Sequence, residues 1–243
     1  MPSIDVKKHV REVYEQGFTY VPAFYSPAEC AQMREIIDAY WRSKGSPALN
    51  LAEFGFTIHP LLAAVPNLIP FMDRPILRDL LGEVLMDEPR CAHLGSRMSD
   101  VQCVERLPWH HHYGWDNNGL LGRKRIERVL WSPYVDGSMD EVGPVVMYPR
   151  RVDDPIGDMR GPLQQAWPGE VALKMPPGSM TVFDTAVWHS AKRGTQPGRR
   201  RLWGAHFQGW NDPRNHPEDN AVDVPEANQF KKSPTLKSFI SGK

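Results

Sequence analysis

Three consecutive histidines stand in the stretch Leu107-Pro108-Trp109-His110-His111-His112-Tyr113-Gly114-Trp115-Asp116. The residues before them are strand-like, and alternate residues of a strand project to one face of a sheet. We therefore predict that His110 and His112 point the same way and that His111 points to the opposite face. A fourth histidine, His189, ends another strand-like run further along the chain. Two neighbouring imidazoles and a distant third form a facial set of ligands for a divalent metal.

This set is close to the 2-His-1-carboxylate triad, which holds iron in non-haem oxygenases and leaves coordination positions open for substrate and O2. Here a histidine, His112, stands where the carboxylate is expected. Arg200 follows His189 at a distance of eleven residues, between two further arginines. A guanidinium binds a carboxylate through two parallel hydrogen bonds, so an inward-facing Arg200 suits a dicarboxylate co-substrate. Arg199 and Arg201 are expected to face away from the site.

Composition limits the class of protein. The chain has 243 residues, which fits one large domain, and its 29 basic and 29 acidic residues produce no overall field favouring nucleic acid or an anionic membrane. Its 23 prolines and 19 glycines indicate many turns. Three cysteines without zinc-type spacing argue against a disulfide framework, and no apolar run is long enough to cross a bilayer. The start of the sequence lacks the apolar core of a signal peptide, so a soluble cytoplasmic protein is expected.

Hydrophobic patterns predict helices first and strands afterwards. A helix ending at Gly17, a second helix capped by Ser26-Pro27-Ala28-Glu29 and mostly helical structure at 58–86 precede the change to strands near Arg90. Such an order indicates a β-sandwich or barrel buttressed by N-terminal helices. Residues 211–243 are polar and rich in proline, and are expected to form a loose tail that could fold over the barrel mouth. The predicted strands are 99–106, 128–135, 145–149, 170–174, 180–183 and 200–210.

At these residues the chain resembles the phytanoyl-CoA dioxygenase family of Fe(II)/2-oxoglutarate-dependent oxygenases. The likeness extends from Glu15-Gln16-Gly17-Phe18 to about Trp210, and Pro108-Trp109-His110 is similar to the start of the family's His-x-Asp motif. Gly143-Pro144-Val145 resembles the segment that ends in the family's "PGSH". Arg150-Arg151 replaces the small residues of that segment. The order and spacing of these motifs carry the resemblance.

The resemblance implies a mainly β protein with flanking helices. Its double-stranded β-helix core (a cupin-like jelly roll) would occupy about residues 89–210, after N-terminal helices over about 1–88, within one oxygenase domain of residues 1–210. It places His189 on the distal iron ligand, Arg200 on the anchor for 2-oxoglutarate, and Ser190 beside that co-substrate. Fe(II) and 2-oxoglutarate are therefore the expected cofactors, with a small molecule and O2 as reactants. A homodimer is an allowed arrangement.

The departure at His112 leaves three interpretations open. In the first, His110, His112 and His189 bind iron as a 3-His site. In the second, the motif shifts by two residues to His112-Tyr113-Gly114, which resembles the iron halogenases, where a small residue leaves room for chloride. In the third, Asp116 supplies the third ligand or no catalytic iron is held. The unshifted 3-His site is preferred because Pro108-Trp109 directly precedes His110.

The aromatic residues near the motif indicate a pocket for a flat or hydrophobic small molecule. Tyr113 and Trp115 alternate with the ligands, and Trp131 lies in a nearby strand, so these three are predicted to line the pocket. The expected function is oxidation of a small molecule, with hydroxylation as the preferred reaction. Two rival functions remain: a 3-His iron dioxygenase that acts without 2-oxoglutarate, and a jelly-roll binding protein whose iron site has decayed.

Overall fold

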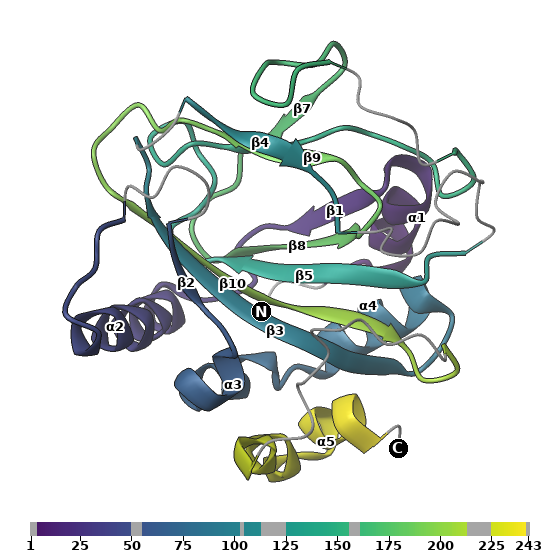
Figure 1. Ribbon diagram of the computed structural model, residues 1–243. Coiled ribbons are helices and arrows are strands. Elements are labelled where there is room, and N and C mark those ends of the chain that lie inside the picture. The colour runs from purple at the N-terminus through teal and green to yellow at the C-terminus, as the bar shows by residue number, and fades with distance from the viewer. Residues whose placement is uncertain are drawn as a thin grey trace.

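The computed structural model describes residues 4–49, 55–102, 105–112, 125–155, 161–212 and 225–241. Two antiparallel sheets face each other, and helices cover the outer face of the larger sheet (Figure 1). This is the layout of a jelly roll with flanking helices, so the predicted fold class is confirmed. Within the described residues no helix is both long enough and apolar enough to cross a bilayer.

The larger sheet has six strands and the smaller sheet has four. The long pairing between β10 and β3 in the larger sheet is antiparallel over almost the whole length of both strands. The larger sheet has the order β1 (Phe18–Val21), β8 (Ser179–Asp184), β5 (Arg128–Tyr134), β10 (Arg199–Gly209), β3 (Pro89–Asp100) and β2 (Phe56–Ile58). The smaller sheet has the order β4 (Arg106–His110), β9 (His189–Lys192), β6 (Val145–Met147) and β7 (Val171–Leu173).

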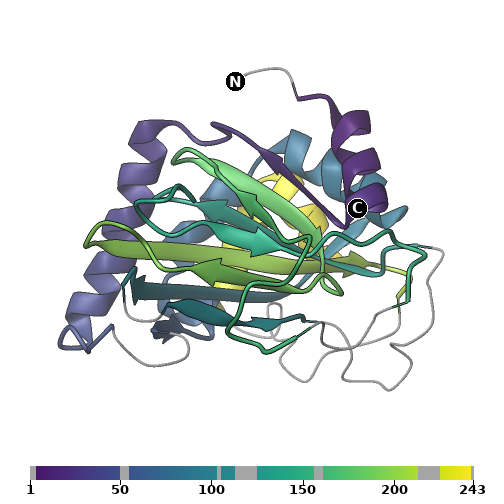
Figure 2. The same cartoon turned by 90° about the horizontal axis from the view of Figure 1, so that it is seen from above.

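Two N-terminal helices flank the larger sheet. α1 (Val6–Gln16) ends at Gly17, whose φ of 89° is the left-handed conformation that glycine adopts most easily. α2 (Pro27–Ser43) begins with the predicted capping box, in which Ser26 and Glu29 each satisfy a backbone N–H of the other. In both views these helices lie at opposite ends of the sheet (Figure 2).

Prolines divide the next helical region into short pieces, as predicted. α3 (Leu61–Ala64), the 3-10 helix η1 (Pro66–Met72) and α4 (Pro75–Leu85) follow one another, and the last two begin with a proline in the first turn. A proline in the first turn costs no hydrogen bond, because the N–H it lacks would have no partner in the helix. The buried leucines of α4 join the main hydrophobic core against the sheet.

Strict alternation along the strands separates the main core from the space between the sheets. On β5 and β10 the aromatic rings of Trp131, Trp203 and Phe207 face the helices and are 0–1% exposed. Their neighbours, such as Leu130 and Leu202, face the opposite sheet. Successive residues of a strand point to opposite faces, so the larger sheet has one core-forming face and one pocket-forming face.

The C-terminal segment differs from its prediction. In its described part, η2 (Pro225–Lys232) and α5 (Pro234–Ser241) pack on the helical side of the larger sheet, away from the space between the sheets (Figure 1). Phe230 and Phe239 are fully buried, and the Phe239 ring lies 5.0 Å from that of Phe207. The prediction of a loose tail or lid is therefore wrong for residues 225–241, because a few apolar side chains at helical spacing attach an otherwise polar segment.

One strand was also predicted in the wrong place. Residues 99–106 were expected to form a single strand, but β3 runs from Pro89 to Asp100 and β4 begins at Arg106. On β3 the helix-facing Leu94 and Met98 alternate with polar or small residues that face the pocket. This polar face made the strand difficult to recognise from its hydrophobicity.

Candidate metal centre

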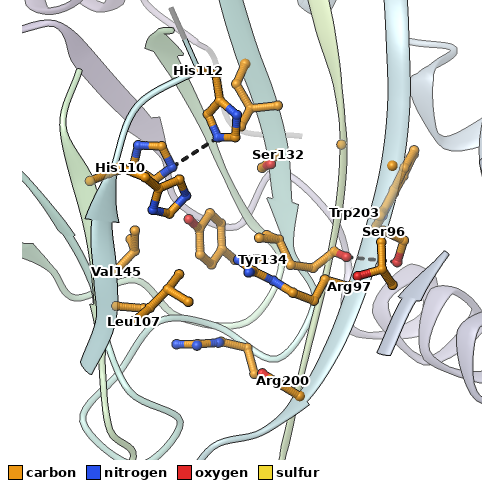
Figure 3. A pocket seen from close by; sticks show the side chains of 18 of the residues that line it. Ser96, Arg97, Leu107, His110, His112, Ser132, Tyr134, Val145, Arg200 and Trp203 are labelled. Atoms are coloured by element: carbon orange, nitrogen blue, oxygen red, sulfur yellow. Dashed lines mark hydrogen bonds between the residues drawn. The ribbon is translucent and has the colours of Figure 1, made fainter. Parts of the chain in front are cut away.

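Three histidines meet between the two sheets. His110 ends β4, His189 begins β9, and the two residues are direct partners in the antiparallel register. His112 follows β4, and its backbone N–H donates to the carbonyl oxygen of Thr185 at 2.8 Å. One nitrogen from each of the three rings lies within 4.8 Å of the other two (Figure 3). The structure thus brings together the three predicted metal ligands.

Hydrogen bonds to the backbone orient two of the rings. Nδ1 of His110 lies 2.8 Å from the carbonyl oxygen of Pro108, and Nδ1 of His189 lies 3.0 Å from that of Val187. A carbonyl oxygen only accepts, so each Nδ1 carries the proton and each Nε2 keeps its lone pair. This arrangement is typical of metal-ligating histidines, in which the second nitrogen is held by a neighbouring acceptor.

Burial keeps these rings neutral. Loss of hydration is the main cause that lowers the pKa of His110 from 6.5 to about 4. Burial likewise lowers the pKa of His112 and of His189 well below 6.5, and neighbouring histidines lower both further. A metal ion binds the neutral form of imidazole, so the site needs no deprotonation near neutral pH before it binds a metal.

The three histidines stand at one side of a pocket of about 570 Å³ between the sheets. This size is within the roughly 300–1,000 Å³ of pockets that enclose small molecules. Leu130, Phe183 and Leu202 give it apolar walls, and Tyr134 lies near its centre (Figure 3). Burial raises the pKa of Tyr134 to about 12, despite the opposing effect of nearby Arg200, so the phenol stays protonated.

Arg200 enters the pocket, whereas both neighbouring arginines point to the outer face of β10. The Arg199 guanidinium lies over the Trp41 ring of α2, 4.3 Å from its centroid. Arg201 makes a bidentate pair with Asp38 of α2, at 2.6 and 2.8 Å, and also contacts Asp136. Arg200 donates to the carbonyl oxygen of Gly143 at 3.0 Å. Only the middle arginine of the three is thus placed to bind a ligand between the sheets.

Ser190 lies in the pocket wall but already uses its hydroxyl proton. Its Oγ donates to the carbonyl oxygen of Leu107 at 2.6 Å and links β9 to β4 beside the metal centre. Any contact with a co-substrate would therefore use the remaining lone pairs of this hydroxyl. His111, as predicted, faces away from the pocket, and its ring lies 4.5 Å from that of Trp188.

Not every predicted pocket residue is found there. The prediction for Trp131 is wrong: the ring lies on the helical face of β5, where its Nε1 contacts the sulfur of Met180 at 3.2 Å. The alternation of the strand places Leu130 and Ser132 in the pocket in its stead. Tyr113 and Trp115, together with Gly114 and the alternative ligand Asp116, lie outside the described residues.

The structure adds pocket residues that sequence reasoning missed. His206 on β10 lies beside the metal centre, 5.1 Å from His112 between ring centroids, and His93 on β3 lies 5.5 Å from His206. His59 follows at 4.9 Å from His93. Arg97, also on β3, lines the pocket as well. One sequence pattern points to these residues. Polar residues stand at alternate positions in β3 and β10, and these two strands pair in the sheet.

No protein-family model and no curated protein sequence matches the chain. Solved structures do match. The non-heme alpha ketoglutarate dependent carbocyclase SnoK from nogalamycin biosynthesis has a TM-score of 0.64 at 17% identity, over 84% of this chain and 83% of its own. HygX from Streptomyces hygroscopicus, with nickel and 2-oxoglutarate bound, has a TM-score of 0.65 at 14% identity, over 84% and 87%.

AviO1 from Streptomyces viridochromogenes Tue57 matches with a TM-score of 0.65 at 14% identity, over 89% of this chain and all of its own. At such identities the likeness concerns the fold. The chain has the jelly-roll fold of these proteins, among which SnoK is described as dependent on alpha-ketoglutarate (2-oxoglutarate) and HygX as binding it.

Proposed function

We propose that this protein is a non-haem Fe(II)- and 2-oxoglutarate-dependent oxygenase that oxidises a small molecule. The observation that carries the proposal is the joint placement of the His110, His112 and His189 nitrogens and the Arg200 guanidinium in one pocket between two sheets. The shared fold with 2-oxoglutarate-dependent enzymes supports it independently. The order of motifs adds a resemblance to the phytanoyl-CoA dioxygenase family.

The residues present fit the proposed metal. Two of the three imidazoles have their Nδ1 hydrogens bound to backbone carbonyls, and burial keeps all three rings neutral. Nε2 of His112 lies 3.2 Å from Nε2 of His189, so one cation could contact both nitrogens when each offers its lone pair. Iron and 2-oxoglutarate, when bound, supply the oxidising chemistry, in which O2 is consumed and 2-oxoglutarate is converted to succinate and CO2.

The other residues bind, orient and exclude water. Arg200 would bind the carboxylate of 2-oxoglutarate that lies far from the metal, since a guanidinium offers two parallel hydrogen-bond donors. Burial raises the pKa of Tyr134 to about 12, so this phenol stays protonated. It therefore offers a hydroxyl group near Arg200 in the pocket. Leu130, Phe183 and Leu202 form an apolar wall that limits water near the reacting groups.

Three observations argue against the alternative functions, one for each alternative. The side chain of His110 lies in the cluster itself, with its ring centroid 4.2 Å from that of His189, which favours the unshifted motif over the halogenase-like His112-Tyr113-Gly114. An iron dioxygenase that cleaves a chelated substrate directly has no need of an arginine such as Arg200 in the pocket. The oriented imidazoles argue against a decayed metal site.

Turnover of 2-oxoglutarate tests the proposal. Tag-free protein loaded with Fe(II) is mixed with 2-oxoglutarate and O2, and succinate is followed by NMR, because enzymes of this kind commonly consume some co-substrate even without substrate. We expect O2-dependent succinate formation in the wild type and none in His189→Ala. Equal succinate formation in both proteins, or none in the wild type under any substrate mixture, would reject the proposal.

A further inference from the structure

A row of small residues crosses the pocket-facing side of the larger sheet. Gly95 on β3 and Gly204 on β10 are direct register partners, and both line the pocket. Ser132 on β5 also lines it and lies next to Gly204, since a methyl group at position 204 would be 2.6 Å from Ser132 Oγ. Side chains are thus absent or short across three neighbouring strands, which together span about 10 Å at the usual strand spacing.

Larger side chains stand on both sides of this row and make it a slot. Two positions away along β3 and β10, the pair His93 and His206 stands on one side of the row, and the pair Arg97 and Leu202 on the other. Residues two positions apart on a strand face the same way, so all four side chains rise from the same face as the row. All four line the pocket. The floor between them is backbone, on which a flat group can lie.

The Ser132 hydroxyl independently indicates a ligand in this slot. Ser132 is only 2% exposed, and within the described part of the chain its Oγ has no hydrogen-bond partner. Its side chain belongs to the wall of the pocket (Figure 3). The hydroxyls of Ser96 and Ser190 in the same pocket differ, since they donate to the carbonyl oxygens of Leu202 and Leu107. A buried hydroxyl without a partner is unfavourable, and a ligand group that bonds to it removes this cost.

The two glycines keep the slot open in different ways. A methyl group on Gly204 would collide with the carbonyl oxygen of Trp131 and would crowd the Ser132 hydroxyl. A methyl group on Gly95 would meet only Nε2 of His93, at 3.5 Å, which is an ordinary contact. The fold therefore has room for a side chain at position 95. Glycine weakens a strand interior and often marks a place where a ligand approaches the backbone closely.

We propose that this slot holds the substrate, and that the substrate is a small molecule with a flat ring bearing a hydroxyl or carbonyl group that Ser132 binds. This inference rests on the proposed function and adds the substrate class. The glycine floor admits a planar group, the His93 and His206 rings offer aromatic contacts, and Leu202 offers an apolar one. A serine hydroxyl both donates and accepts, so it can bind either kind of oxygen.

Three small probes, each differing from the next in one property, test the proposal. Phenol has a flat ring and a hydroxyl, toluene has the flat ring without the hydroxyl, and cyclohexanol has the hydroxyl on a puckered ring. Each probe is titrated anaerobically into the Fe(II)·2-oxoglutarate protein. Binding is followed by saturation-transfer NMR, which registers millimolar affinities.

The variants separate the two parts of the slot. Ser132→Ala removes the hydroxyl, and Gly95→Val fills the floor, with Gly95→Ala as a smaller change at the same position. Ser96→Ala is the matched control for the serine, because the Ser96 hydroxyl already donates to the carbonyl oxygen of Leu202 at 2.8 Å. Gly198→Val is the control for the glycine, because position 198 has open space around it and does not line the pocket.

We expect the wild type and both controls to bind phenol about three- to tenfold tighter than toluene, on the scale of one hydrogen bond, and tighter than cyclohexanol. Ser132→Ala should lose the preference for phenol over toluene. Gly95→Val should weaken both flat probes about tenfold or more, and Gly95→Ala should weaken them less. The affinity for 2-oxoglutarate, measured by calorimetry, should stay within about threefold in all these variants, which also shows that they are folded.

Three results would overturn the proposal. One is that the wild type binds toluene or cyclohexanol as tightly as phenol. Another is that phenol binds equally to the wild type and to both Gly95 variants, which would place the ring elsewhere. The third is that Ser132→Ala weakens 2-oxoglutarate as much as Arg200→Ala does, which would assign Ser132 to the co-substrate.

Failure of the proposed function has a different signature, namely no binding of 2-oxoglutarate to the wild type. In that case the three probes are compared on the Fe(II) protein alone. A preference for phenol that depends on Ser132 would then still support the slot as a ring-binding site, and its absence would reject it.

Discussion

Nε2 of His112 lies 3.2 Å from Nε2 of His189, across the gap between the end of β4 and the start of β9. The two rings come from positions 77 residues apart, and a third imidazole, His110, completes the group. Each of these buried imidazoles can offer a nitrogen lone pair, so the three together can bind one cation between them. The first prediction concerns this metal.

His189→Ala should abolish Fe(II) binding, because it removes the imidazole that contacts both other rings. The wild type should bind about one Fe(II) per chain under anaerobic conditions, measured by metal analysis of tag-free protein. His111→Ala is the matched control, since this neighbouring ring packs on Trp188 outside the pocket and its loss should leave the stoichiometry unchanged. Retention of iron in His189→Ala would rule out this assignment of the metal ligands.

His112→Asp should keep both the fold and the metal, since a carboxylate at this position restores the common triad. Activity should fall or change its product, because the variant replaces a neutral ligand by an anionic one. Asp116→Asn should leave Fe(II) binding unchanged, as measured by the same metal analysis. A loss of iron in Asp116→Asn would instead support the Asp116 carboxylate as the third ligand. Full native activity in His112→Asp would mean that the reaction does not require an imidazole at position 112.

Arg201→Ala should destabilise the protein far more than Arg200→Ala. Arg201 pairs with Asp38 and Asp136, and all three side chains are at most 16% exposed, so the truncation leaves two largely buried carboxylates without this partner. The expected loss is about 3 kcal/mol in the free energy of unfolding. Arg200→Ala removes one described hydrogen bond to a backbone carbonyl and should cost about 1 kcal/mol or less. Urea unfolding of both variants measures the difference, and equal losses would contradict it.

The metal-free protein should lose stability as the pH falls below 6.5. Burial lowers the pKa of His110 from 6.5 to about 4, so between these values the unfolded chain binds a proton that the folded chain does not. The free energy of unfolding should therefore decrease on acidification through this window, by about 1.4 kcal/mol per pH unit for each such imidazole, with no contribution above it.

Urea unfolding of the metal-free wild type and of His110→Asn, at several pH values between about 7.5 and 4.5, checks this dependence. The variant should show a shallower decrease than the wild type, because one of the groups that resist protonation has been removed. The same slope in both proteins would mean that His110 titrates normally in the folded state.

Much of the fold could be predicted from local signals. The capping box at Ser26, the left-handed glycine at Gly17 and the prolines between α3 and α4 determine helix ends by backbone chemistry alone. The strands with alternating apolar residues were also located. β3 was misplaced because its pocket-facing side is polar, and α5 was missed because its attachment depends on contacts with distant residues such as Phe207.

The candidate site was predictable where spacing carries the chemistry. Alternation placed His110 and His112 together, and it separated Arg200 from Arg199 and Arg201. It could not place Trp131, because the choice between the two faces of β5 depends on which sheet face the helices cover. Arg97 and His206 were not recognised for a related reason, since their shared pocket exists only when β3 pairs with β10.

Anaerobic calorimetric titration of 2-oxoglutarate into the Fe(II) protein tests the central claim most directly. We predict that the wild type binds one 2-oxoglutarate per chain only when Fe(II) is present, and that Arg200→Ala weakens this binding roughly 100-fold, as expected when one partner of a buried charged pair is truncated. Arg199→Ala, whose side chain lies over Trp41 outside the pocket, should bind as the wild type does. No binding to the wild type, or equal binding in wild type and Arg200→Ala, would contradict the assignment.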